Sequence, residues 1–550
     1  MQSNKREEYL NILKKSKYDI LVIGGGATGA GIALDASSRG LRTALIEMND
    51  FASGTSSRST KLIHGGLRYL KQLDLGLVHE TGTERAILHN LAPHMVIPEK
   101  MILPLVDGGT YGKLATSFGL KVYDVLAGVK GDDRRKMLSK QETLKLEPLL
   151  NEKILQGSGF YAEYRTDDAR LTIELVKTAC RYGAQSLNYI KAVDFEYMDD
   201  RIVGVICEDQ LADHRFSIFA SEVVAAGGPW VDELRMIDRP KTSKRIHHTK
   251  GVHIVVPSEK FPLDYTVYYD GPDGRMMFAI PRGRITYIGT TDTNYHGDLS
   301  RIVSTQDDVK YILNSLVEAF PSVKLSVDDV ISNWAGVRPL IHEEGKSPSE
   351  LSRKDEIFES STGLIAIAGG KLTGYRKMAE RVVDKVVKRL SKKGISEIKS
   401  CQTKHIPLTE KVLDTQEVQE LIEKLEIRIK SYQLDSYFSW YLVTNYGYAA
   451  TEILDGVIKF KNSPEISLTR AELAHCLEKE LVVSLEDFYV RRTGKLYFEI
   501  NNIALTKEFI IEDFVQYFNW TEAEKMKKVA AFDVEYQDAT TFYEQEFTIS

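Results

Sequence analysis

Residues 18–47, YDILVIGGGATGAGIALDASSRGLRTALIE, decide the fold of the N-terminal part of this chain. The apolar run 18–23 ends at glycine and is too short for a helix, so it predicts a buried strand. A helical stretch then runs to Arg39 with Gly40 as its cap, and 42–47 predicts a second strand. Strand, helix and strand together form a βαβ unit, the building block of a doubly wound sheet.

Three glycines at the turn between the first strand and the helix fit the pattern G-x-G-x-x-G: Gly24, Gly26 and Gly29. The first permits a tight turn, the second lets the backbone approach a pyrophosphate, and the third packs the helix on the strand. Glu47, about twenty residues further on, is placed to accept hydrogen bonds from an adenosine ribose, and its charge disfavours a 2′-phosphate. The unit therefore predicts a dinucleotide site and argues against NADP.

Three further segments favour FAD over NAD. In 53–68, SGTSSRSTKLIHGGLR, small hydroxyl groups and paired glycines allow close approach to a bulky ligand. Strand-to-glycine junctions at 223–228 and 364–370 bring more glycine backbone to the same edge of the sheet. FAD is long enough to need such distributed contacts. The predicted cofactor-binding residues beyond the glycine turn and Glu47 are Thr55, Ser56, Ser57, Lys61, Ala226, Gly227, Gly370, Lys371, Leu372 and Thr373.

The composition excludes several classes of protein. With 550 residues, a net charge of −6 and a hydrophobic fraction of 43%, the chain is unlike a nucleic-acid polycation or a disordered chain. Its cysteines show no CxxC spacing and no HExxH motif occurs, so we expect no metal site and a reducing compartment. The charged N-terminus does not resemble a secretory signal, and no apolar stretch is long enough to cross a bilayer.

The order of expected strands and helices divides the chain into three parts. Strand-like runs cease after about residue 400, so 396–550 is expected to form an all-helical C-terminal domain. The fold class is α/β, with a doubly wound FAD-binding domain expected over 18–105, 160–250 and 345–395. An interleaved α+β substrate domain is expected over 106–159 and 251–344.

A set of motifs in fixed order resembles one family. The motifs are DILVIGGGATGAGIALDASSRG (19–40), TSSRSTKLIHGGLRYL (55–70), VVAAGGPW (223–230), YIGTTD (287–292), GVRPL (336–340) and GGKLTGYRKMAE (369–380). Together they resemble the FAD-dependent glycerol-3-phosphate dehydrogenases, within the broader superfamily of glycine-oxidase and D-amino-acid-oxidase-like flavoproteins. The resemblance covers about 18–393, and LEDFYVRRTG (485–494) extends it into the C-terminal helices.

The resemblance implies oxidation of sn-glycerol 3-phosphate to dihydroxyacetone phosphate, with electrons passed from FAD to a membrane quinone. A sister group, the soluble glycerophosphate oxidases, uses oxygen and typically carries an insertion in the middle of the chain. No inserted tract is evident, which favours the dehydrogenase. An amino-acid oxidase and a non-catalytic flavin-bearing sensor are the remaining alternatives.

The substrate implied by this resemblance carries a phosphate dianion, which calls for several fixed cations. Arginine suits it because its planar fork holds two oxygens at once. Arg338 is the first candidate, since Pro339 restricts its backbone. Lys371 follows a glycine pair and is placed to reach flavin or substrate. The further substrate-side residues are Arg68, Tyr69, Asp292 and Arg353, of which Asp292 either orients a neighbour or caps its turn.

Removing a hydride from an alcohol carbon also requires a base for the hydroxyl proton. Histidine suits this role because its pKa lies near neutrality. His64, between Ile63 and Gly65, and His253, inside KGVHIVVP (250–257), are the two histidines placed in motifs. The sequence leaves open which of them takes the proton, and Arg338 and Lys371 complete the predicted catalytic set.

The stretch 376–393, RKMAERVVDKVVKRLSKK, predicts an amphipathic helix with a basic outer face. Eight basic residues against Glu380 and Asp384 leave +6 on this segment. Its apolar stripe is expected to pack inside the protein, so a membrane role falls to the basic face, which would contact anionic headgroups. We therefore expect a cytoplasmic protein, peripherally attached to the inner membrane face, and a homodimer is possible.

Overall fold

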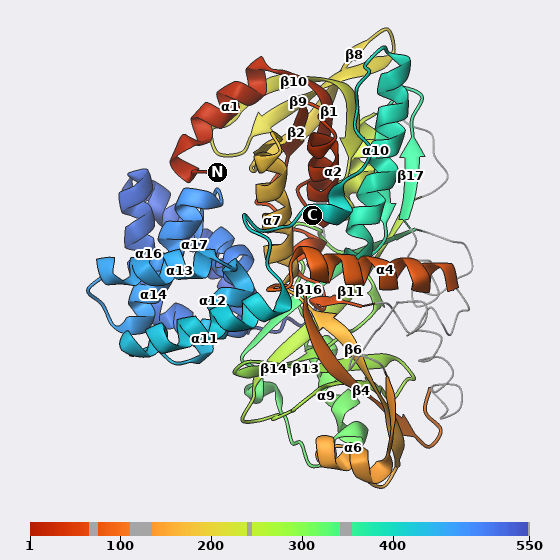
Figure 1. Cartoon of the computed structure of the whole chain (residues 1–550), viewed down its shortest axis with the longest axis vertical. Helices are drawn as coiled ribbons and strands as arrows, with labels where there is room; N and C mark the ends of the chain where they lie inside the picture. The colour runs from red at the N-terminus through yellow and green to blue at the C-terminus, as the bar shows by residue number, and fades with distance from the viewer. Residues whose placement is uncertain (65–74, 111–134, 239–244, 342–354, 548–550) are drawn as a thin grey trace.

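The structure of this chain is a computed structural model that describes residues 1–64, 75–110, 135–238, 245–341 and 355–547. Two sheets follow one another along the long axis of the molecule, and a group of helices lies beside them (Figure 1). The predicted α/β fold with a helical C-terminal region is confirmed. Arg68, Tyr69 and Arg353 lie outside the described residues.

The first sheet has eight strands in the order β17-β18-β10-β1-β2-β7, with β8 and β9 joined to it through β10. Its strands are β1 (Lys17–Ile23), β2 (Thr43–Ile46), β7 (Gln185–Leu187), β8 (Ile190–Met198), β9 (Arg201–Asp209), β10 (His214–Ala225), β17 (Asp355–Glu359) and β18 (Ile365–Gly369). The central pairs are parallel, from β18 through β10 and β1 to β2 and β7. All of β1 after Lys17 is buried, as expected for a parallel strand covered on both faces.

Helices α2 (Ala27–Ser38), α7 (Asp168–Arg181) and α10 (Tyr375–Lys392) pack as neighbours, with α2 in contact with the other two. The small residues of α2 make this close packing possible. A Cβ added at Gly31 would lie 2.9 Å from the ring of Tyr375 on α10. The run of Gly and Ala in the sequence therefore sets how closely α10 approaches the βαβ unit.

The second sheet has ten strands in the order β15-β11-β14-β13-β12-β4-β6-β3, with β16 paired to β11 and β5 to β6. Its strands are β3 (Leu62–Ile63), β4 (Ile97–Val106), β5 (Lys136–Ser139), β6 (Leu155–Arg165), β11 (Ile246–Pro257), β12 (Thr266–Asp270), β13 (Met276–Arg282), β14 (Ile285–Gly289), β15 (Thr293–Asn294) and β16 (Ser332–Ile341). Helices α6 (Lys140–Leu146) and α9 (Gln306–Ala319) accompany it.

Membership of this sheet corrects the expected domain division. The sequence assigns 18–105 and 160–250 to the FAD-binding domain, but β3, β4 and β6 pair with one another and with β12 in the second sheet. The reason is long-range pairing: β4 runs parallel to β12, more than 150 residues away in the chain. Local periodicity identifies a strand but does not say which sheet it joins.

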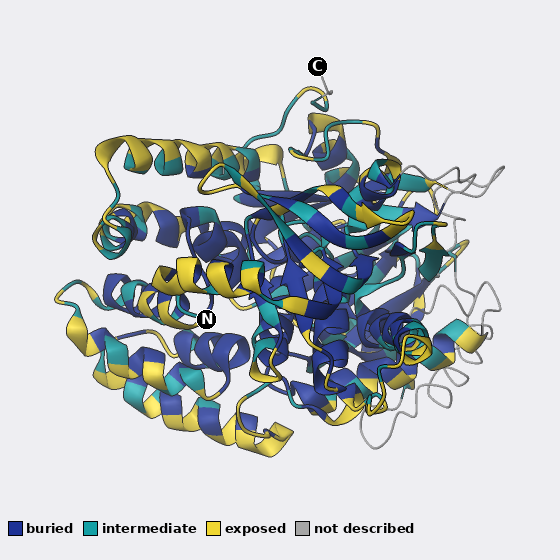
Figure 2. Cartoon of the chain, turned by 90° about the horizontal axis from the view of Figure 1, so that it is seen from above, coloured by how far each residue is buried: buried dark blue, intermediate teal, exposed yellow. Residues whose placement is uncertain are grey.

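The C-terminal region consists of helices that share one apolar core. These are α11 (Thr415–Ser431), α12 (Tyr437–Tyr446), α13 (Ala449–Gly456), α14 (Pro464–Lys479), α15 (Lys495–Phe498), α16 (Ile500–Phe518), α17 (Glu522–Thr540) and the π-helical turn η9 (Asp487–Arg492). Figure 2 shows exposed residues along the outer faces of peripheral helices and buried ones towards the sheets. Trp334 and Tyr287 of the second sheet belong to the same core, which joins the two regions.

The described residues form several further helices and 3₁₀ turns. They are α1 (Arg6–Lys15), α4 (Leu75–Leu91), α8 (Val231–Ile237), η1 (Ser3–Lys5), η2 (Thr55–Ser57), η4 (Gly228–Trp230), η5 (Val327–Asp329), η6 (Leu372–Gly374), η7 (Thr403–His405) and η8 (Val457–Lys459). Of the helices in the described ranges, none combines the length and the apolar character needed to cross a membrane.

The basic residues of 376–393 are mostly paired within the chain. Arg376 pairs with Glu84 and Glu380, Lys377 with Glu380, and Arg381 with Glu80 and Asp355. Lys385 pairs with Glu359, Arg389 with Glu359 and Glu222, and Lys393 with Glu222. Neighbouring elements thus supply carboxylates that the linear sequence does not reveal, and they offset much of the +6 counted on this segment. Lys388 and Lys392 are exposed, and the described residues place no carboxylate within ion-pair distance of either.

Candidate functional site

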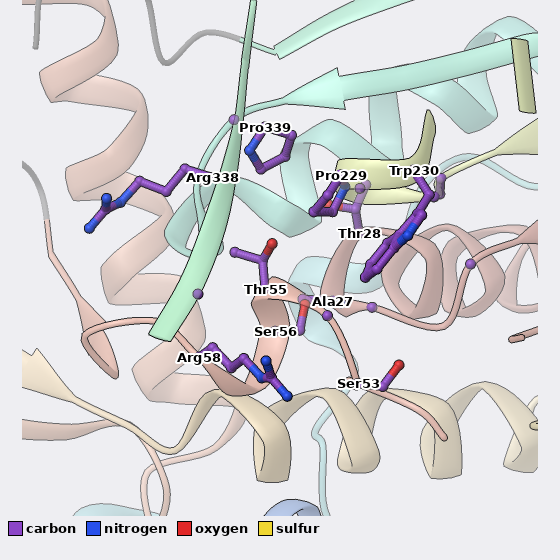
Figure 3. A pocket seen from close by; sticks show the side chains of 18 of the residues that line it. Ala27, Thr28, Ser53, Thr55, Ser56, Arg58, Pro229, Trp230, Arg338 and Pro339 are labelled. Atoms are coloured by element: carbon purple, nitrogen blue, oxygen red, sulfur yellow. Dashed lines mark hydrogen bonds between the residues drawn. The ribbon is translucent and has the colours of Figure 1, made fainter. Parts of the chain in front are cut away.

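A cavity of about 320 Å³ lies where the two sheets meet. Its walls come from segments far apart in the chain, from Ile23 at the end of β1 to Tyr375 at the start of α10. The C-terminal ends of β1, β10 and β18 open into it, which is where ligands bind in open parallel sheets. In Figure 3, Arg338 and Trp230 lie on opposite sides of Thr55.

The glycine turn forms the cavity wall at the N-terminus of α2. Gly24 has φ +112°, and a Cβ there would lie 2.4 Å from the Ala226 carbonyl oxygen. A Cβ at Gly26 would lie 3.0 Å from Ser56 Oγ, which accepts a 3.0 Å hydrogen bond from the Ala27 backbone N–H. Bare backbone at a helix N-terminus fits an anionic pyrophosphate. Gly29 does not line the cavity; it packs α2 against Gly24.

Glu47 lies at the end of β2 and lines the cavity. Its carboxylate accepts hydrogen bonds from the backbone N–H of Gly25 at 2.6 Å and of Asn49 at 2.9 Å. Burial raises the pKa of Glu47, and these two hydrogen bonds oppose that shift. The residue therefore holds the glycine turn in shape as well as facing the ligand space.

Only some of the hydroxyl groups of the 53–64 segment line the cavity. Thr55 and Ser56 line it, whereas Ser57 and Lys61 are buried behind it. Lys61 Nζ lies 2.5 Å from Asp168 Oδ1 and donates to the Ser57 carbonyl at 3.1 Å. Ser57 and Lys61 thus fix the course of the segment and do not line the cavity, so their contact with the cofactor stays a prediction.

Two strand ends close the far wall of the cavity. Ala226 and Gly227 follow β10, and Gly370, Lys371, Leu372 and Thr373 follow β18; all six line the cavity. Thr373 Oγ1 donates a 3.2 Å hydrogen bond to the His64 carbonyl. This bond joins the end of the first sheet to the segment that carries the predicted base.

Arg338 enters the cavity from β16. Its guanidinium lies over Gly251 of β11, where a Cβ would stand 2.2 Å from Nη2. Nη1 lies 3.2 Å from Asp292 Oδ1, and Nη2 donates to Thr290 Oγ1 at 3.0 Å. Asp292 itself does not line the cavity, so it orients the arginine.

The two candidate histidines differ in how deeply their side chains are buried. His64 lines the cavity and makes an edge-on contact with the ring of Phe278. His253 is 1% exposed, stacks on Trp334, and has Nε2 3.0 Å from Thr60 Oγ1. Burial lowers the pKa of His253 well below its usual value, and the positive charges of Arg338 and Lys61 lower it further. Thr60 stands between this neutral ring and the cavity.

Several lining residues were not predicted. Trp230 covers the side of Gly54, and the GGPW motif could have indicated it. Arg58 lines this cavity and also a second one of about 330 Å³ beside α17, where it lies 3.3 Å from Glu535. No local pattern distinguishes Arg58 from a surface arginine.

Comparison with known proteins finds relatives that match this chain over nearly its whole length. Residues 19–376 match the family of FAD dependent oxidoreductases, and 401–525 match the C-terminal domain of alpha-glycerophosphate oxidase. An aerobic glycerol-3-phosphate dehydrogenase of Bacillus subtilis is 46% identical over 550 residues, which cover 99% of both chains. One of Staphylococcus aureus is 47% identical over 525 residues, 94% of each chain.

Solved structures resemble this fold as well. The glycerol-3-phosphate dehydrogenase of Bacillus halodurans, solved with FAD, is 40% identical, with a TM-score of 0.83 and 100% coverage of both chains. The L-alpha-glycerophosphate oxidase of Mycoplasma pneumoniae shares the fold, with a TM-score of 0.55 and 18% identity over 68% of this chain and 95% of its own. The chain therefore belongs to the FAD-dependent oxidoreductases and, among them, to the aerobic glycerol-3-phosphate dehydrogenases.

Proposed function

We propose that this protein oxidises sn-glycerol 3-phosphate to dihydroxyacetone phosphate with FAD as its cofactor. The observation that carries the proposal is that one cavity joins a glycine-lined dinucleotide cradle to the cations of Arg338 and Lys371. We propose that the dinucleotide and a small phosphorylated alcohol bind side by side there. The names of the full-length relatives support the same substrate.

The residues present fit FAD. Gly24, Gly26 and Ser56 offer backbone and hydroxyl groups to a pyrophosphate, and Glu47 is the acceptor for the adenosine ribose. The strand ends after β10 and β18 are the proposed contacts for the flavin half. When bound, FAD supplies the acceptor for the hydride that leaves C2 of the substrate.

We assign the proton of the C2 hydroxyl to an imidazole nitrogen of His64, because His64 lines the cavity. His253 is a poorer candidate, since its ring is buried and Thr60 separates it from the ligand space. We propose that His253 positions Thr60. The reaction is balanced: the C2 hydrogen leaves with both bond electrons to the flavin, and the hydroxyl proton goes to His64 as the C2–O double bond forms.

The phosphate is assigned to Arg338 and Lys371. Arg338 is already oriented by Asp292 and Thr290, so little freedom is lost when a phosphate binds. A planar guanidinium held in this way can bind two phosphate oxygens. Arg68, Tyr69 and Arg353 remain proposed substrate-side residues.

Anaerobic mixing of the purified, FAD-loaded protein with glycerol 3-phosphate tests the proposal. The visible absorption band of oxidised flavin should disappear rapidly, whereas glycerol and glycine should leave it unchanged. His64→Gln should slow the bleaching, and His247→Gln should not, since His247 does not line the cavity. Bleaching by glycine but not by glycerol 3-phosphate would overturn the substrate assignment.

We further propose that the electrons pass to a quinone, at the cytoplasmic face of an anionic membrane. A quinone resides in the bilayer, so the protein must dock there to reduce it. The exposed Lys388 and Lys392 are the proposed contacts, because the other cations of α10 are paired.

The second candidate is an oxygen-using glycerophosphate oxidase, favoured by the match of 401–525 to the C-terminal domain of that enzyme. The two candidates differ in the fate of the electrons. A short-chain quinone should reoxidise the dehydrogenase much faster than air does, and rapid stoichiometric peroxide formation in air would favour the oxidase.

A further inference from the structure

Two consecutive arginines of the C-terminal region reach into the first-sheet region. Arg491 and Arg492 belong to the π-helical turn η9, and both bind the carboxylate of Asp50. Arg491 Nε donates to Asp50 Oδ2 at 2.6 Å, and Arg492 donates to both oxygens, at 2.7 and 3.0 Å. Asn188 Nδ2 adds a fourth hydrogen bond at 2.9 Å. The side chains of Asp50 and Arg492 are completely buried.

Asp50 sits directly behind the cofactor cradle. It lies three residues after Glu47, and its carbonyl accepts a 3.1 Å hydrogen bond from the Ser53 N–H. The Ala52 N–H donates to the Gly25 carbonyl at 3.1 Å, which ties the same loop to the glycine turn. The loop then continues into Thr55 and Ser56 of the cavity wall. Any shift of Asp50 would therefore move groups that face the ligand space.

The charges at this contact are fixed. Burial would raise the pKa of Asp50, but Arg492 and Arg491 outweigh it and hold the pKa below its ordinary value. Buried ion pairs are poor devices for stability alone, because desolvation offsets their attraction. Their directional hydrogen bonds do, however, specify one geometry. A buried carboxylate that accepts four hydrogen bonds behind a binding loop can therefore hold that loop in one position.

The turn itself is anchored on the C-terminal side. Arg491 Nη2 donates to Asp487 Oδ1 at 2.7 Å, and Arg492 Nη2 donates to the Glu480 carbonyl at 2.8 Å. Asp487 also accepts a 2.6 Å hydrogen bond from the hydroxyl of Tyr189, which precedes β8. Both arginines are thus held rigidly before they meet Asp50.

We propose that Arg491 and Arg492 are positioning residues for FAD, which act by holding Asp50 and with it the loop that carries Glu47, Thr55 and Ser56. The C-terminal helices would then be part of the cofactor site without touching the cofactor. Linkage requires the converse: bound FAD strengthens the contact between η9 and Asp50.

The test measures FAD affinity in the full-length protein after removal of its flavin, by quenching of FAD fluorescence on titration. Arg492→Met should weaken FAD binding by about tenfold or more, the range seen when partners behind metal ligands are lost. Arg492→Lys should recover part of the affinity, since a lysine retains the charge but not the two-oxygen fork. The matched control is Arg470→Met, which breaks a two-bond pair with Asp513 inside the C-terminal region and should change FAD affinity by less than about twofold.

Asp50→Asn keeps the proposal testable if Arg492→Met does not fold, because it removes the charge while retaining the shape. It should also weaken FAD binding, and combining it with Arg492→Met should cost less than the sum of the two. Hydrogen exchange at 487–492 should slow when FAD binds to the wild type, but not in Asp50→Asn. FAD affinity equal to wild type in Asp50→Asn, or equal losses in Arg470→Met and Arg492→Met, would overturn the proposal.

Discussion

The guanidinium of Arg338 lies over a glycine and is held in one direction by its neighbours. Gly251 leaves room for the guanidinium of Arg338, and Asp292 with Thr290 fixes its direction. The group is therefore oriented before any substrate arrives, which lowers the entropy lost on binding. The specificity for a phosphate would then depend on a residue that carries no side chain at all.

Gly251→Ala tests that dependence. Its Cβ would stand 2.2 Å from Arg338 Nη2, so the guanidinium must move away. We expect kcat/KM for glycerol 3-phosphate to fall by up to about a hundredfold, the cost of a misplacement near 1 Å. Arg338→Leu should cost ~2 to 5 kcal/mol in the same parameter, because it leaves charged partners unmatched.

Both variants should retain normal FAD, measured by the ratio of flavin to protein absorbance. Arg284→Leu, which removes an exposed arginine paired with Asp435, serves as the control and should leave kcat/KM unchanged. Near-normal turnover of glycerol 3-phosphate in Arg338→Leu would show that the phosphate binds elsewhere.

At the scale of elements, the turn between β1 and α2 requires glycines, because other side chains would fill the space there. Gly26 is the N-cap of α2 and has Ser56 beside it, so its backbone faces the space assigned to pyrophosphate. The N–H groups of the first helical turn attract an anion there. A branched side chain at this point would occupy the anion's position.

Gly26→Val should therefore yield folded protein with little or no flavin. The Cβ alone would stand 3.0 Å from Ser56 Oγ, and the valine methyl groups would add further bulk to the cavity wall. We expect FAD affinity to fall by far more than in Gly456→Ala, a control in α13 where the added Cβ meets Ala471 at an ordinary 3.4 Å. Circular dichroism should be unchanged, and a yellow Gly26→Val protein would contradict the assignment.

How far the sequence predicts these features depends on the range of the interactions. Gly24, Gly26, Thr55, Ser56 and Arg338 follow from local patterns or motifs, and all of them line the cavity. Lys61 belongs to the same motif but forms a buried ion pair with Asp168, a partner more than 100 residues away, and the Ser57 hydroxyl donates to the Gly54 carbonyl. The sheet that β4 joins and the ion pairs of the α10 cations also depend on partners far away in the sequence, so local patterns do not predict them.

At the scale of the whole molecule, ion pairing leaves the surface less polarised than the linear charge pattern suggests. Arg381 and Arg389 of α10 bridge to β17 and other elements, so they contribute to cohesion of the first-sheet region. Lys388 and Lys392 remain exposed on the outer side. A membrane contact through this helix would be weak and reversible.

Lys388→Glu combined with Lys392→Glu should reduce binding to anionic vesicles, since each basic residue near such a surface contributes about 1 kcal/mol. Salt should have the same effect on the wild type through screening. Reduction of a soluble dye should continue unchanged. The control, Lys424→Glu with Lys527→Glu, alters the net charge equally on the C-terminal helices. Wild-type protein that ignores anionic vesicles at low salt would refute membrane docking through this helix.

The residues that line the cavity are far apart in the sequence, and this affects when the site forms during synthesis of the protein. Residues that face the ligand space begin at Ile23 and end at Tyr375, and Asp50 contacts Arg492. A ribosome releases the chain from its N-terminus, so the glycine turn emerges long before β18 or η9 exists. We therefore expect the cavity wall to be completed only after residue 375 has left the ribosome, and FAD to bind late in the synthesis of the protein.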